Sequence, residues 1–141
     1  YFNKYKKLDF LFGSVNKYKL LHGYYPQKIK WSFGFYSTHS IGFFIKKEAH
    51  KKVGFYNIKY KYSADYDLFY RLIVKKKMIG MGTKKSEVFG KFRSGGLSSR
   101  IRYIDFLKEC TQIRLDNKQN FFIVYLIFFA RLLRNFKKIL K

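Results

Sequence analysis

The chain has 141 residues, which is enough for one domain with its own hydrophobic core and too short for two domains of ordinary size. Hydrophobic residues make up 48% of the chain and aromatic residues 22%, a composition that excludes a disordered tail. The 31 basic and 8 acidic side chains give a net charge of +23, which attracts the phosphates of nucleic acids, anionic lipids or nucleotide-linked substrates.

The first half of the chain is expected to form short strands and one short helix. The run LDFLFGSV, residues 8–15, predicts a buried strand, and residues 17–29 predict a loop or hairpin. Residues 41–45 are typical of an apolar strand, and residues 47–53 are typical of a short basic helix that ends at Gly54.

The second half is expected to alternate helices with strands. A helix is predicted over residues 65–77, DYDLFYRLIVKKK, because apolar residues recur at helical spacing and lysines crowd the last turn. Residues 80–99 predict strands and glycine turns, and residues 102–117 predict a second amphipathic helix. The apolar face of this second helix is expected to hold Ile104, Leu107, Cys110 or Thr111, and Arg114 or Leu115. This alternation indicates an α/β fold.

Residues 118–141 are predicted to form a basic amphipathic helix. Their uninterrupted apolar part, residues 121–130, is shorter than the roughly 20 residues that span a bilayer. Helical spacing separates a basic from an apolar face, with Arg131, Arg134, Lys138 and Lys141 opposite Leu132, Leu133, Phe136 and Leu140. The pattern predicts a helix lying on an anionic membrane surface, the alternative being a helix docked on another part of a longer protein.

Cysteine and histidine residues indicate neither a disulfide nor a metal site. Cys110 is the only cysteine, which excludes an internal disulfide and suits a reducing compartment. The histidines His22, His39 and His50 are too dispersed for the spacing of metal ligands. The chain begins at Tyr1 without a methionine and without the apolar core of a signal peptide, so we expect it to be a piece of a longer protein.

Two carboxylates stand two positions apart, at Asp65 and Asp67, in a chain where acids are scarce. The other six stand singly, at Asp9, Glu48, Glu87, Asp105, Glu109 and Asp116. In a structural interpretation, Ser63 and Asp65 are helix N-cap residues and Asp67 pairs with Arg71. In a functional interpretation, a carboxylate at a helix start accepts a proton from a substrate hydroxyl, and a neighbouring like charge raises its pKa. The two interpretations are compatible.

Four motifs in a fixed order resemble the C-terminal half of family 2 glycosyltransferases, the inverting enzymes of the GT-A fold. His39-Ser40 precedes a strand whose continuation, FFIKKEAHKKVGFYN, is similar to the family segment F-R-R-x-x-[FY]-x-x-[LIV]-G-x-[FY]-[DN]. ADYDLFYRL is similar to [EA]-D-Y-D-L-x-x-R-L, and FRSGGLSS to F-R-x-G-G-x-S. The resemblance covers residues 8–117. It implies that residues 1–117 form the acceptor-side half of such a domain, followed by the helix of residues 118–141.

The resemblance implies that Asp65 is the catalytic base, which removes a proton from the acceptor hydroxyl for in-line attack on the anomeric carbon of a nucleotide sugar. Asp67 falls at the second acidic position and is expected to cap or orient the helix. Many members of the family carry Glu just before the base, whereas this chain carries Ala64. The base therefore lacks one adjacent carboxylate that could raise its pKa.

Further substrate-binding residues are implied around the other motifs. His39 is either a polar residue at a strand start or a contact for the acceptor or the diphosphate. Gly95 and Gly96 are expected in a tight turn that requires positive φ. Arg93 and Ser98 flank this turn, where they either contact phosphate or sugar oxygens or are simply solvated.

The donor-binding half of the family ends in an Asp-x-Asp motif. This chain has no such motif before Asp65, because the only acids there are Asp9 and Glu48, so the donor-binding half has no counterpart in the chain. A divalent cation, Mg²⁺ or Mn²⁺, is expected for a full-length enzyme, with ligands outside this chain. The implied activity is sugar transfer to a polysaccharide or lipid-linked acceptor at the cytoplasmic face of the cell membrane. The alternatives are a non-catalytic basic protein that binds RNA or an anionic membrane, and an inactive remnant; no specific nucleic acid is expected for the enzyme.

Overall fold

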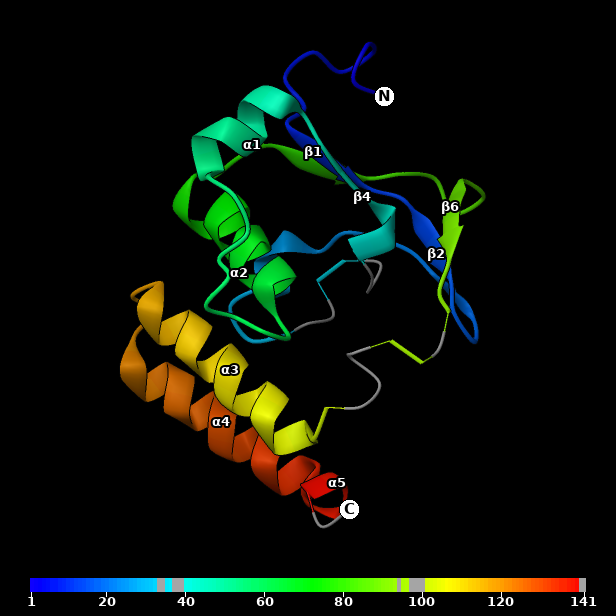
Figure 1. The fold of residues 1–141 in the computed structure, drawn as a ribbon. Helices are drawn as coiled ribbons and strands as arrows, with labels where there is room; N and C mark the ends of the chain where they lie inside the picture. Colours follow the sequence, from blue (N-terminus) through cyan, green and yellow to red (C-terminus); the bar gives the residue numbers. More distant parts are fainter. Residues whose placement is uncertain (33–34, 37–39, 94, 97–100, 140–141) are drawn as a thin grey trace. The chain divides into compact units, whose positions relative to one another are not determined.

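The computed structural model describes residues 1–32, 35–36, 40–93, 95–96 and 101–139. The described residues form an α/β protein with two mixed three-stranded sheets and five α-helices, which confirms the predicted class (Figure 1). They divide into two compact units. Unit 1 comprises Tyr1–Phe55 and Leu68–Arg93, and unit 2 comprises Tyr56–Asp67 and Ser94–Lys141.

The first sheet of unit 1 has β1 (Phe10–Phe12) at its centre, between β4 (Phe43–Ile45) and β5 (Gly80–Gly82). β1 is antiparallel to β4 and parallel to β5, so that Leu11 pairs with Phe44 on one side and Met81 on the other. All three residues of β1 are buried, as expected for a central strand without a solvent-facing side.

The second sheet of unit 1 has β2 (Ser14–Asn16) between β3 (Leu20–Leu21) and β6 (Val88–Lys91). β2 forms a hairpin with β3 that turns at residues 17–19, ahead of the predicted position at His22, Gly23 and Pro26, and β2 is parallel to β6. The predicted strand over residues 8–15 is therefore real but divided at Gly13, which sends its two halves into different sheets. A Cβ atom at Gly13 would lie 1.9 Å from Cδ2 of Phe89, so a side chain there would displace this ring.

Helix α1 spans Lys47–Val53, as predicted, and Gly54 ends it with a backbone amide that donates to the His50 carbonyl. The predicted strand at residues 41–45 is shorter, because a 3₁₀ turn occupies Ser40–Gly42. Helix α2 spans Ala64–Tyr70 and continues as a π-helical turn over Arg71–Lys75. A further 3₁₀ turn spans Pro26–Lys28.

Aromatic rings fill the core of unit 1. Phe12 is 1% exposed and forms the centre of this core. Its ring centroid lies 4.8–6.4 Å from those of Phe10, Tyr24, Phe35, Tyr36, Phe43 and Phe69. Several of these pairs meet edge to face, the arrangement that the ring quadrupole favours.

Unit 2 contains α3 (Tyr103–Asp116), α4 (Phe121–Arg134) and α5 (Phe136–Ile139). α3 and α4 lie side by side and α5 contacts both (Figure 1). On α3, the predicted apolar face is confirmed at Leu107, Cys110 and Thr111, which are buried, and the buried residue in the next turn is Arg114 rather than Leu115. α3 and α4 belong to the same unit, and the predicted division of the chain after residue 117 stays a prediction.

The prediction of one continuous helix over residues 118–141 is wrong at Asn135. The backbone amide and the side-chain amide of Asn135 both donate to the Arg131 carbonyl, at 3.1 and 3.0 Å, and end α4. A side chain that donates to the carbonyl four residues earlier competes with the regular backbone bonds of a continuing helix. Among the described residues, no helix is both long enough and apolar enough to cross a bilayer.

Replacing the central ring of unit 1 is expected to destabilise it strongly. Phe12→Ala should lower the free energy of unfolding by about 3–5 kcal/mol, because six rings lose contacts and a cavity remains. Urea titration followed by the fluorescence of Trp31, the only tryptophan and a residue of unit 1, measures the loss. Tyr18→Ala is the control, since Tyr18 is 89% exposed and should change stability by less than about 0.5 kcal/mol. Similar stability of the two variants would contradict the assignment of the core.

Candidate active site

The candidate site lies in unit 2, where residues 56–63 lead into the first turn of α2 and pack against α3. This first turn carries both Asp65 and Asp67. The position of their carboxylates depends on how the preceding segment is held, because that segment has no regular secondary structure of its own between α1 and α2.

Glu109 of α3 binds three consecutive backbone amides at the entry to α2. Its Oε2 accepts from the Lys61 amide at 2.9 Å, and its Oε1 accepts from the amides of Tyr62 at 2.8 Å and Ser63 at 2.6 Å. Hydrogen bonds to an ionised carboxylate are stronger than those between neutral groups. Glu109 therefore fixes the backbone immediately before the first helical residue, Ala64.

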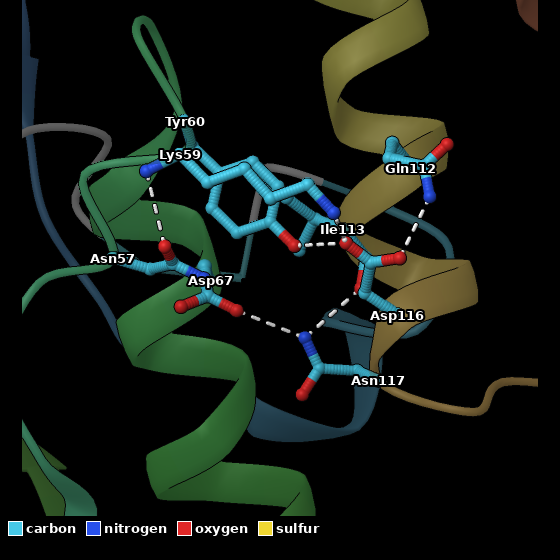
Figure 2. A network of polar contacts seen from close by, with 8 residues as sticks. All are labelled: Asn57, Lys59, Tyr60, Asp67, Gln112, Ile113, Asp116 and Asn117. Carbon is cyan, nitrogen blue, oxygen red and sulfur yellow. Dashed lines mark hydrogen bonds and ion pairs between the residues drawn. The ribbon is translucent and has the colours of Figure 1, made fainter.

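A second carboxylate of α3, that of Asp116, binds the same segment at residues 59 and 60, further from the start of α2 (Figure 2). Oδ2 of Asp116 accepts from Lys59 Nζ and from the Tyr60 hydroxyl, each at 2.6 Å, and its Oδ1 accepts from Gln112 Nε2 at 2.7 Å. These donors lower the pKa of Asp116 to about 2, with the hydrogen bond from Lys59 as the largest cause. Glu109 and Asp116 are two helical turns apart, so one side of α3 binds the whole segment.

Asp67 is a buried structural group. It is 3% exposed, and its Oδ1 accepts from Asn117 Nδ2 at 2.9 Å, while the same nitrogen donates to the Ile113 carbonyl (Figure 2). The amide of Asp67 donates to the Ser63 carbonyl at 3.2 Å, as in a first helical turn. This environment favours the predicted role in orienting the helix, and its predicted pairing with Arg71 stays a prediction.

Asp65 is partly exposed, in contrast to Asp67. Its Oδ1 accepts from the amide of Tyr66 at 2.8 Å, so the carboxylate bends toward the amides at the helix start. Burial raises the pKa of Asp65 above its ordinary value, and the negative charge of Glu109 raises it further against the lowering effect of the backbone amides of Tyr66 and Asp65. A half-buried carboxylate with a raised pKa at a helix start is suited to accept a proton.

Tyr56 and Tyr66 flank Asp65. Burial, followed by the charge of Asp65, raises the pKa of the Tyr56 hydroxyl, so this group stays neutral. The hydroxyl of Tyr66 accepts from Arg114 Nε at 3.1 Å, and the Arg114 guanidinium lies 5.4 Å from the centroid of the Tyr66 ring. Arg114 is fully buried, and its contact with Tyr66 links α3 to the residue next to Asp65.

The other predicted site residues have different surroundings. Arg93 is exposed and belongs to unit 1, just after β6. Gly95 and Gly96 are exposed residues of unit 2, and Gly95 has φ +97, which confirms its predicted backbone conformation. The positive φ prediction does not hold for Gly96. His39 and Ser98 lie outside the described residues, so their roles stay predictions.

The sequence interpretation treated Glu109 and Asp116 as isolated acids, although both hold the site. Glu109 is separated by 46–48 residues from the amides that it binds, and no local pattern connects them. The sequence contains one indication that the two acids act together, because a spacing of seven residues places both on the same side of the predicted helix.

Two other features of the described residues lie apart from this site. Burial raises the pKa of the Cys110 thiol to about 12, so this cysteine is neutral and does not serve as a nucleophile near neutral pH. An open cavity of about 390 Å³ in unit 1 is lined by Pro26, Gln27, Ile29, Lys30, Trp31, Ile73, Val74 and Lys77, none of which was predicted as a site residue. No group of three His, Cys, Asp or Glu side chains among the described residues is arranged to hold a metal ion.

Comparisons of the chain with protein-family models, curated proteins and solved structures find no match. The resemblance to family 2 glycosyltransferases therefore depends on the four sequence motifs, and the class that the described fold itself defines is α/β.

The bonds of Asp116 predict a specific loss of stability in acid. The pKa of Asp116 in the folded protein, about 2, is below its ordinary value of 3.8. At pH values between these two, the folded form therefore binds fewer protons than the unfolded form. The contribution of Asp116 to stability is complete above about pH 4 and is lost as the pH falls through about 2. Urea unfolding followed by circular dichroism should show Asp116→Asn less stable than wild type at pH 6, with the difference shrinking below pH 4. A difference that is independent of pH would contradict this assignment.

Replacing Glu109 is expected to change both stability and the titration of Asp65. Glu109→Gln removes the negative charge and one acceptor oxygen, so the pKa of Asp65 should fall and stability should drop by about 1–3 kcal/mol. Carbon-13 NMR titration of the Asp65 carboxyl and urea unfolding measure the two effects. Glu48→Gln makes the same chemical change at an exposed position of α1 and should alter neither quantity. An unchanged pKa of Asp65 in Glu109→Gln would disprove the electrostatic coupling.

Proposed function

We propose that this chain supplies the acceptor side and the general base of an inverting glycosyltransferase, with Asp65 as the base. The observation that carries the proposal is the partly exposed Asp65 carboxylate, which is held at the start of α2 in surroundings that raise its pKa. The ADYDLFYRL motif, in which Asp65 occupies the position of the family's base, supports the same role.

In the proposed reaction, Asp65 accepts the proton of an acceptor hydroxyl while the hydroxyl oxygen attacks the anomeric carbon of a nucleotide sugar. The bond between this carbon and the diphosphate oxygen breaks, and the electron pair leaves with the nucleoside diphosphate. Attack from the side opposite the leaving group inverts the anomeric centre. General-base catalysis of this kind typically contributes about 10²–10⁴-fold to a rate.

Glu109 supports the proposal because it replaces an electrostatic effect that the sequence lacks at position 64. Relatives of this motif often carry Glu immediately before the base, whereas this chain has Ala64. Burial is the main cause of the raised pKa of Asp65, and the charge of Glu109 on α3 adds a smaller increase. Glu109 is thus a positioning residue, since it holds the backbone before Asp65 and tunes the carboxylate without contacting the proposed substrate.

The remaining predicted residues take supporting roles in the proposal. Asp67 orients the first turn of α2 through Asn117. His39, Arg93, Gly95, Gly96 and Ser98 stay proposed contacts for the acceptor or the diphosphate. The divalent cation that the resemblance implies is expected to have its ligands outside this chain, and no group of three His, Cys, Asp or Glu side chains among the described residues is arranged to hold it, so no step of the proposed reaction is assigned to it.

The charge of the chain favours a second candidate, a basic protein that binds RNA or an anionic surface without catalysis. The two candidates differ in salt dependence and selectivity. The binding candidate predicts tight binding to unrelated oligonucleotides that weakens steeply with salt, whereas the enzyme predicts weak, non-specific binding to them.

Asp65→Asn, made in this chain joined to the donor-binding half that the proposed enzyme needs, should reduce sugar transfer by roughly 10²–10⁴-fold and leave donor binding nearly unchanged. Transfer from labelled nucleotide sugars to a membrane extract measures turnover, and calorimetry measures donor binding. Asp105→Asn is the control, because Asp105 pairs with Arg102 on the surface at 2.7 Å and contributes little to the fold.

The same variant also separates catalysis from folding. The raised pKa of Asp65 means that the folded form holds its proton more tightly, so ionisation destabilises the fold as the pH rises through the window above the ordinary value of 3.8. Asp65→Asn removes this charge and should be at least as stable as wild type at neutral pH. Full turnover in a folded Asp65→Asn protein would remove Asp65 from the mechanism.

A further inference from the structure

Helix α4 exposes a continuous stripe of large apolar side chains. The exposed fractions are 70% for Phe122, 71% for Leu126, 55% for Phe129 and 75% for Leu133. Their spacings of four, three and four residues place them on one side of the helix. We call these four residues the apolar stripe. Phe136, the first residue of α5, is 55% exposed as well.

The opposite side of α4 is the one that packs within unit 2. Val124 is fully buried, and Ile127, Phe128 and Arg131 are partly buried. Burial and the charge of Arg114, a residue of α3, lower the pKa of Arg131. The predicted basic face is therefore wrong at Arg131, because this residue lies on the packed side of α4 and leaves the outer side of the helix apolar.

The segment that carries the stripe has positive charge at its two ends and no negative charge. Residues 117–141 contain no Asp or Glu, and their basic residues are Lys118, Arg131, Arg134, Lys137, Lys138 and Lys141. Arg134, Lys137 and Lys138 are exposed at the end of α4 and on α5. A continuous exposed apolar stripe on a helix often marks an interaction site, and this charge distribution favours an anionic partner.

A second copy of the chain does not fit this surface. A helix pair with a stripe of spacing four and three is normally stabilised by opposite charges beside the seam. Residues 117–141 offer only cations for these positions, and each copy carries a net charge of +23. An anionic bilayer surface satisfies both features, because acyl chains take up apolar side chains and phosphate headgroups attract the lysines.

We propose that α4 lies in the plane of an anionic membrane surface, with the apolar stripe among the acyl chains and with Arg134, Lys137 and Lys138 at the phosphate headgroups. The stripe spans 12 residues from Phe122 to Leu133, or about 17 Å of helix, which suits a helix in the plane of the surface. This docking is independent of the proposed sugar transfer, and it would place the candidate site near lipid-linked acceptors.

Vesicle binding of the full 141-residue chain tests the docking. Phosphatidylcholine vesicles that contain phosphatidylglycerol should bind wild type, and the double variant Leu126→Gln with Leu133→Gln should bind about tenfold or more weakly at unchanged net charge. Ile58→Gln is the matched control, because Ile58 is a 99% exposed residue of the same unit outside the stripe. Lys137→Gln and Lys138→Gln should each weaken binding about fivefold, which corresponds to roughly 1 kcal/mol per charge near an anionic surface. Circular dichroism checks that every variant keeps its helices.

Depth of insertion provides a readout that charge alone cannot produce. In a Trp31→Phe background, Phe129→Trp should be quenched by lipids with brominated acyl chains, whereas Ile58→Trp should not. Equal binding of the stripe variant and wild type would assign the attraction to net charge and overturn the proposal. Equal binding to neutral phosphatidylcholine vesicles would also overturn it. Vesicle binding that is absent while the chain forms a dimer, and a dimer that the stripe variant abolishes, would identify a second copy as the partner instead.

Discussion

The candidate site depends on one interaction, the binding of three consecutive backbone amides by the carboxylate of Glu109. These amides, at residues 61–63, stand immediately before α2 and need acceptors, because no helical carbonyl is available to them. An ionised carboxylate satisfies all three at once. The bonds Glu109 makes determine where α2 begins, and the first turn of α2 determines where Asp65 lies. Asp116, the last residue of α3, and Asn117, which follows it, extend the same arrangement, since they bind Lys59, Tyr60 and Asp67 (Figure 2).

This arrangement gives the two neighbouring aspartates different chemistry. Asp67 is buried and accepts a hydrogen bond from the side-chain amide of Asn117, so its role is to stabilise the fold. Asp65 is partly exposed and has a raised pKa, so its environment costs stability when it is ionised. Glu109 contributes to both effects, because its bonds stabilise the entry to α2 while its charge opposes ionisation of Asp65. Catalytic groups often have a perturbed pKa and lower the stability of the fold in their charged form. This property motivates the role proposed for Asp65.

Local periodicity predicted the helices well. α1 has the predicted bounds, and α3 begins and ends within a residue of the prediction. α2 begins within a residue of the prediction but ends at Tyr70, and a π-helical turn over Arg71–Lys75 replaces most of the predicted remainder. Helical spacing also placed Leu107 and Cys110 on the buried side of α3. The errors occurred where a neighbouring element decides the outcome. Gly13 divides one apolar run between two sheets, and Arg131 faces inward although its charge predicted an exposed position.

The sequence by itself determined the α/β class, the helices, the pair of acids and the excess of positive charge, because each of these depends on composition or on residues within a few positions of one another. Only the tertiary structure decided which acid is exposed, which acid of α3 binds the entry to α2, and which side of α4 is left uncovered. These properties depend on contacts between residues that are far apart in the chain, such as Glu109 and Ser63, which are separated by 46 positions. Such contacts form when packing brings helices together, and no local pattern of residue types encodes them.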